Sequence, residues 1–111
     1  MTGITTHVLD TSGGHPAAGV HVLLEALSGG GWQSVAQGTT DSDGRLRSLL
    51  NEAPHPGAYR LVFDTRAYFE ARGVNGFYPE VVITFEVAAG ERHYHVPLLL
   101  SPFGYTTYRG S

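Results

Sequence analysis

The sequence predicts an all-β protein, an antiparallel β-sandwich of about eight strands with one short helix, in a single domain covering residues 1–111. Glycine and proline, 15 and 6 of the 111 residues, are spread between short runs rich in valine, threonine and tyrosine. That composition is typical of many strands joined by turns. The runs are regularly spaced, as in a sandwich or barrel, and neither a repeat nor a linker interrupts them. A chain of this length can bury roughly two thirds of its unfolded surface, so it needs no metal or disulfide to fold.

The first half of the chain alternates strands with turns. Residues 11–16 are turn-forming, glycines at 29–31 indicate a hairpin loop, and residues 41–44 form a sharp turn in which Gly44 can adopt a positive φ. Strands are expected at residues 5–10, 20–26 and 32–40, with a very short edge segment at 45–47.

The second half contains the one helix, expected at residues 65–72. Thr65 can cap its start, good helix formers follow, and Gly73 lies just past its end. Strands are expected at residues 58–64, 80–87, 93–100 and 105–108. Aromatic and β-branched residues run almost to the last position, so this end is expected to be held in place rather than frayed.

Composition excludes several classes of protein. The chain has no cysteine, which rules out disulfides, thiol catalysis and thiolate metal sites. A formal net charge of −3 with 15% charged residues argues against a nucleic-acid partner. No apolar run approaches the ~20 residues of a membrane span. The first residues lack the basic start and apolar core of a secretory signal, which predicts a cytoplasmic protein.

Histidines lie on predicted strands beside apolar residues. Side chains alternate along a strand, so His93, His95 and Leu99 share one face, and Tyr94, Val96, Leu98 and Leu100 form the better core face. His7 and Leu9 share a face in the same way. An apolar outer face that carries histidines suggests that it is covered by another subunit. Pro97 has no N–H to donate, so an edge, a bulge or an unpaired donor is expected there.

Pattern alone leaves several interpretations of these residues open. His7 and His95 are either ordinary hydrogen-bonded histidines, or ligands in a metal site that lacks a nearby carboxylate, or a pair for acid–base chemistry. Arg45 is either a solvated edge arginine or an anion clamp. Residues 108–111 are either an ordered tail or part of a site.

Six segments of the chain resemble the 5-hydroxyisourate hydrolases, also called transthyretin-related proteins. The terminal Tyr108-Arg109-Gly110-Ser111 is the most specific, because it separates these hydrolases from the thyroid-hormone carrier transthyretin, which has the same fold. Together the segments extend over nearly the whole chain without large gaps. They are Thr5-Thr6-His7-Val8-Leu9-Asp10-Thr11, Pro16-Ala17, Asp41-Ser42-Asp43-Gly44-Arg45-Leu46, Tyr59-Arg60-Leu61-Val62-Phe63-Asp64-Thr65, Phe77-Tyr78-Pro79-Glu80-Val81 and residues 93–111.

The resemblance implies a transthyretin-like (prealbumin-like) sandwich, assembled as a homotetramer around a channel. It also implies hydrolysis of 5-hydroxyisourate to 2-oxo-4-hydroxy-4-carboxy-5-ureidoimidazoline in urate degradation, with neither cofactor nor metal. The partners it implies are this small-molecule substrate and copies of the same chain, and neither nucleic acid nor membrane. By position, the catalytic residues are His7, Arg45, His95 and Ser111, and the substrate-binding residues are His7, Arg45, Tyr108, Arg109, Gly110 and Ser111.

Two other classes of protein share parts of this pattern. A transthyretin-like carrier of a small hydrophobic ligand would have apolar or neutral residues in place of His7 and His95, and would lack the Tyr-Arg-Gly-Ser ending. An accessory sandwich domain beside a peptidase would be fused to a larger chain. The histidines and the ending of this sequence favour the hydrolase.

Overall fold

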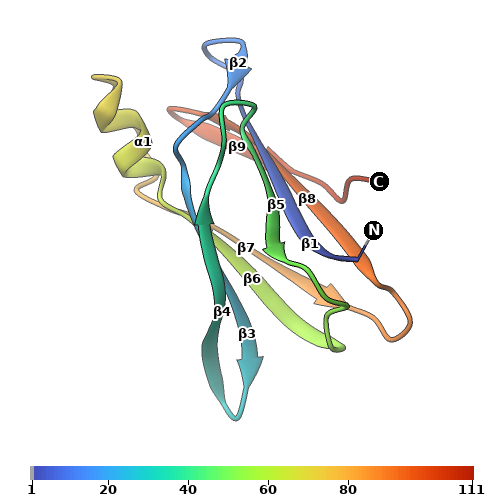
Figure 1. Cartoon of the computed structure of the whole chain (residues 1–111). Helices are drawn as coiled ribbons and strands as arrows, with labels where there is room; N and C mark the ends of the chain where they lie inside the picture. The colour runs from blue at the N-terminus through green and yellow to red at the C-terminus, as the bar shows by residue number, and fades with distance from the viewer. Residues whose placement is uncertain (1) are drawn as a thin grey trace.

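Two β-sheets packed face to face, with one helix beside them, make up the computed structural model, which describes residues 2–111 (Figure 1). In the first sheet the order is β2 (His15–Pro16), β1 (Gly3–Asp10), β8 (His93–Ser101) and β9 (Gly104–Thr107), and β5 (Arg45–Leu50) pairs with β1. In the second sheet the order is β4 (Gly31–Thr39), β3 (His21–Ser28), β6 (Gly57–Phe63) and β7 (Val81–Val87). The helix α1 (Thr65–Ala71) follows β6. The predicted sandwich with one short helix is confirmed.

One strand pair departs from the antiparallel prediction. β1 and β8 run parallel, in a register that extends from Gly3 opposite His93 to Asp10 opposite Leu100. Parallel strands cannot be joined by a tight hairpin and need a long connection. Here almost the whole chain connects them, so no local turn signal in the sequence reports their relative direction. Figure 1 shows the two strands side by side, with both chain ends on the same side of the sandwich.

Smaller differences concern the ends of elements. The predicted turn at 11–16 contains the two-residue strand β2, and the short segment at 45–47 extends to Leu50, because Leu49 is buried in the core. Thr65 was expected to cap α1, but the Asp64 carboxylate accepts from the Ala67 N–H at 3.1 Å. The Thr65 hydroxyl instead donates to the Tyr78 carbonyl at 2.7 Å. Within residues 2–111, no helix is long and apolar enough to cross a bilayer.

The core lies between the sheets and follows the predicted alternation of side chains. Val8 of β1 and Leu98 of β8 are fully buried, whereas His7 and His95, one or three positions away, are only partly buried on the outward face. A one-residue slip of either strand would exchange these faces. Apolar packing of the inner face therefore holds the histidines on the outer one.

Pro97 occupies a gap in the pairing of β8. The pairing with β9 ends at Leu98 opposite Thr107, and the tail pairs again only at His95 opposite Gly110. The Pro97 carbonyl accepts from the Thr107 hydroxyl at 2.7 Å. A proline can stand here because the pairing of β8 with the segment that follows it is interrupted at this position.

A buried polar link ties the end of β1 to α1. The Asp10 carboxylate accepts from the Tyr68 hydroxyl at 2.7 Å, from the Ser12 N–H and hydroxyl, and from the Gly13 N–H. Burial alone would raise the pKa of Asp10, but these hydrogen bonds together lower it. Burial and the bond to Asp10 raise the pKa of Tyr68 to about 12.

Tyr68→Phe should therefore lower the free energy of unfolding by about 1.5–3 kcal/mol, the usual contribution of a hydrogen bond to a charged group. Urea denaturation at pH 7 measures the change. Tyr105→Phe is the control, because Tyr105 is exposed on β9. Equal stability of Tyr68→Phe and the wild type would show that the link does not anchor α1.

Candidate active site

The outward face of the first sheet contains a polar cavity of about 150 Å³. Strands β1, β5 and β8 and the end of the chain build it. Of the four residues that the resemblance assigns to catalysis, Arg45, His95 and Ser111 line this cavity, and His7 lies opposite Arg45 in the register of β1 and β5. The cavity is also lined by Thr5, Arg47 and His93.

The pairing of β1 with β5 and with β8 determines which side chains meet in the site. Thr5 lies opposite His95 on β8, and His7 lies opposite Arg45 on β5. All four side chains share one face of the sheet because alternate residues of a strand point the same way. The pairing with β8 is continuous through the site, whereas the register with β5 shifts between Ile4 and Thr6.

His95 is partly buried, and this changes its acid–base behaviour. Burial lowers its pKa below the ordinary value of 6.5, and the electrostatic effects of the neighbouring His7, His93 and Arg45 side chains act in the same direction. A hydrogen bond with the Thr5 backbone partly opposes them. His95 is therefore neutral at pH 7 and has one ring nitrogen with a free lone pair, as a general base requires.

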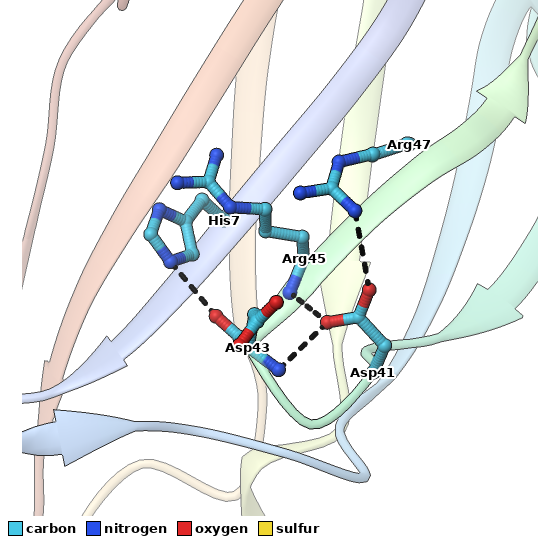
Figure 2. Close-up of polar contacts among 5 residues, drawn as sticks. All are labelled: His7, Asp41, Asp43, Arg45 and Arg47. Carbon is cyan, nitrogen blue, oxygen red and sulfur yellow. Dashed lines mark hydrogen bonds and ion pairs between the residues drawn. The ribbon is translucent and has the colours of Figure 1, made fainter.

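The turn at residues 41–44 fixes His7. Its Nε2 donates to the Asp43 carbonyl at 2.9 Å, since a carbonyl can only accept, and Nδ1 is left as the ring atom with a lone pair (Figure 2). The Asp41 carboxylate holds the turn by accepting from the Asp43 N–H at 2.8 Å and the Arg45 N–H at 3.0 Å. Gly44 has φ 75°, and a Cβ there would lie 2.3 Å from the Val8 carbonyl oxygen, so only glycine fits.

The two arginines of β5 have different surroundings. Figure 2 shows the Arg45 guanidinium beside the His7 ring and the Arg47 side chain near Asp41. The Arg47–Asp41 pair is 3.8 Å apart and exposed, so it contributes little to stability. Arg45 makes no side-chain ion pair within residues 2–111, which leaves its charge available for an anion or a developing oxyanion.

The tail returns to the site through its last two residues. The Gly110 N–H donates to the His95 carbonyl at 2.8 Å, and Ser111 lines the cavity. Arg109 anchors this arrangement by lying 4.3 Å above the Tyr94 ring, donating to the His93 carbonyl at 3.2 Å and pairing with Glu91 at 3.7 Å.

Tyr108 and Arg109 line a different cavity from that of the histidines. This larger cavity, of about 360 Å³, lies between β7, β8 and the tail, and includes Phe85 and Tyr94. The Tyr108 side chain is 57% exposed. The assignment of both residues to substrate binding stays a prediction.

Sequence reasoning did not single out Thr5 and Arg47 as site residues, and it considered His93 only as a partner of His95 on the same strand face, as in a metal site. The alternation of side chains along each strand could have identified them as neighbours of the site. Thr5 shares a face with His7, Arg47 with Arg45, and His93 with His95. No three metal-ligating side chains come together among residues 2–111. The chemistry that these side chains can perform is proton transfer and stabilisation of negative charge on a small molecule.

Fold and site together define a transthyretin-like sandwich with an ionisable, outward-facing small-molecule site. The chain belongs to the HIUase/Transthyretin family, whose family model matches residues 4–110.

Relatives of this chain include 5-hydroxyisourate hydrolases and transthyretins. A 5-hydroxyisourate hydrolase of Salmonella dublin is 47% identical over 109 residues, which span 97% of this chain and 80% of the relative. The structure of a Klebsiella pneumoniae 5-hydroxyisourate hydrolase has a TM-score of 0.86 at 33% identity, covering 97% of this chain and 98% of the other. Sea bream transthyretin in complex with thyroxine has a TM-score of 0.90 at 37% identity, covering 96% and 93%.

Gly110→Ala should displace the tail from His95. A Cβ at this position would lie 2.6 Å from the His95 ring, closer than atoms pack, and 3.2 Å from Pro97, which is a tight contact. We expect a shift of the His95 imidazole resonances in nuclear magnetic resonance (NMR) spectra. Gly104→Ala is the control, since a Cβ there would meet Ser101 at an ordinary 3.8 Å. Unchanged His95 resonances in Gly110→Ala would contradict the close contact.

Proposed function

We propose that this chain is a 5-hydroxyisourate hydrolase, which opens the substrate ring with water to give 2-oxo-4-hydroxy-4-carboxy-5-ureidoimidazoline in urate degradation. The observation that carries the proposal is the neutral, partly buried His95, which shares a cavity with Arg45, whose guanidinium makes no ion pair among residues 2–111. A base and a cation in one polar cavity are what amide hydrolysis needs. The enzymes among the relatives support the same activity.

The reaction breaks the bond between a ring carbonyl carbon and the neighbouring ring nitrogen. As water attacks the carbonyl carbon, His95 takes one proton from the water, and the carbonyl oxygen becomes negatively charged. When the tetrahedral intermediate collapses, the ring nitrogen leaves and receives a proton from the imidazolium. The carbon becomes the carboxylate of the product, and the nitrogen becomes part of its ureido group.

Arg45 and His7 contact different parts of the substrate in this proposal. Arg45 binds the anionic substrate and stabilises the charge that grows on the carbonyl oxygen. His7, with its proton held on Nε2 by the Asp43 carbonyl, presents the Nδ1 lone pair as an acceptor for a ring N–H of the substrate. The two histidines thus act as a pair in which His95 transfers the proton and His7 orients the ring.

The tail closes the site in this proposal. Ser111 hydrogen-bonds the substrate ring from the edge of the cavity, and Gly110 keeps the main chain against His95. Tyr108 and Arg109 complete the motif. Arg109 acts by packing over the Tyr94 ring and by donating a hydrogen bond to the His93 carbonyl. The chemistry uses side chains alone and calls for no cofactor.

A homotetramer belongs to the proposal, because the outward face of the first sheet is only partly covered. Leu9 and Leu99 lie opposite each other in the register of β1 and β8, on the same face as the histidines. Both are half-buried in a single chain. Packing of this face against a second copy would bury the leucines and enclose the histidine cavity.

A carrier without catalysis is the second candidate, favoured by the close structural similarity to a transthyretin that binds thyroxine. Binding a ligand without reaction does not require a base beside a cation. The ionisable groups on the outward face therefore favour the hydrolase.

Sedimentation velocity should give four times the 11.9 kDa mass of one chain. Leu99→Glu should sediment as a smaller species, since it places a charge on the proposed contact. Leu27→Glu is the control, because Leu27 is half exposed near the end of β3. A wild-type protein that turns over substrate as a monomer would overturn this part of the proposal.

His95→Ala should lower kcat by roughly 10²–10⁴-fold through loss of the base. Arg45→Ala should lower it by roughly 10²–10³-fold through loss of oxyanion stabilisation. The ultraviolet decay of freshly made 5-hydroxyisourate, corrected for its spontaneous decay, measures both. His21→Ala is the control, because His21 is exposed on β3 in the other sheet. Near-normal turnover by a folded His95→Ala or Arg45→Ala protein would remove the role given to that residue.

A further inference from the structure

Thr5 places one buried hydroxyl between two histidines of the site. Its Oγ1 lies 2.8 Å from His95 Nδ1 and 3.4 Å from His93 Nε2. The residue is only 5% exposed, and its position opposite His95 is fixed by the parallel pairing of β1 and β8. Threonine is branched at Cβ and stiff at χ1, so a strand holds this hydroxyl in place.

A hydroxyl donates one hydrogen bond and can accept two, so it can bridge the two rings as donor to one and acceptor from the other in two ways. In the first, His95 Nδ1–H donates to Thr5, and the Thr5 hydroxyl donates to His93 Nε2. In the second, His93 Nε2–H donates to Thr5, and the Thr5 hydroxyl donates to His95 Nδ1. The first leaves the lone pair of His95 on Nε2, whereas the second puts a proton there. If both rings donate to Thr5 Oγ1, the lone pair of His95 is again on Nε2, but neither ring accepts from Thr5.

Of the two bridging arrangements, only the first makes His95 Nε2 a base. It also needs no reorganisation during the reaction, because Thr5 Oγ1 accepts from Nδ1–H both before His95 takes a proton and after. In the second arrangement the lone pair of His95 points at Thr5 and away from any substrate. The partner of one imidazole nitrogen commonly sets the state of the other in this way.

We propose that Thr5, with His93 as its acceptor, is a positioning residue that holds His95 in the Nδ1–H tautomer and so gives Nε2 its lone pair. The role in catalysis rests on the proposed hydrolase function. The tautomer itself is a property of the protein alone. His7 from β1 and Arg45 and Arg47 from β5 also face this region, and none of them hydrogen-bonds the Thr5 hydroxyl among residues 2–111.

The first test is NMR of protein with ¹⁵N-labelled histidine at a pH where His95 is neutral. His95 is assigned by the loss of its signals in His95→Ala. We expect Nδ1 protonated and Nε2 unprotonated in the wild type, and a shift toward the Nε2–H tautomer in Thr5→Val and in His93→Phe. Thr5→Ser, which keeps the hydroxyl, should restore the wild-type pattern. A wild-type His95 with its proton on Nε2, or a tautomer unchanged in Thr5→Val, overturns the proposal.

The second test measures kcat and KM for 5-hydroxyisourate. Thr5→Val should lower kcat by roughly 10- to 100-fold, the usual effect of losing such a supporting hydrogen bond, with little change in KM. Thr65→Val is the matched control, since it removes a buried hydroxyl with one carbonyl partner near α1. A wild-type kcat in Thr5→Val would overturn the proposed role of Thr5 in catalysis. Should the wild type lack hydrolase activity but show the expected tautomers, the hydrolase proposal fails and the positioning by Thr5 stands.

Discussion

The parallel pairing of β1 with β8 is the contact on which the rest of the structure depends. It joins the first strand of the chain to the strand before the last, from Gly3–His93 to Asp10–Leu100. Its register sends Val8 and Leu98 into the core and leaves Thr5, His7 and His95 outside. A slip of one residue would bury the histidines and expose the core. Packing of the apolar face thus specifies the polar site.

The sequence predicted much of the fold because alternation and turn residues are local signals. It placed His7 and His95 on outward faces and located the helix before Gly73. It could not predict the parallel direction of β8, or the contact between Thr5 and His95, which are 90 residues apart in sequence. Both depend on which strands meet and in what register. The Asp64 cap was missed because the neighbouring Thr65 is also a preferred cap residue, so the sequence offers two adjacent candidates.

The resemblance supplied Arg45 and Ser111 as site residues, and strand geometry explains why they meet His95. Arg45 follows a turn that Asp41 holds against β1, and Ser111 follows a glycine small enough to lie on the His95 ring. The same sandwich is the framework of carriers and enzymes, so the fold alone does not decide the activity. The side chains on one outward sheet face decide it.

The central claim is that this face hydrolyses 5-hydroxyisourate with protein side chains alone. The most direct measurement is the ultraviolet decay of freshly made substrate, with and without protein that has been dialysed against a chelator. We predict a large acceleration over the spontaneous decay that the chelator does not change. A folded protein that leaves the decay rate unaltered would contradict the claim and point to the carrier. An acceleration that the chelator abolishes would contradict the metal-free mechanism.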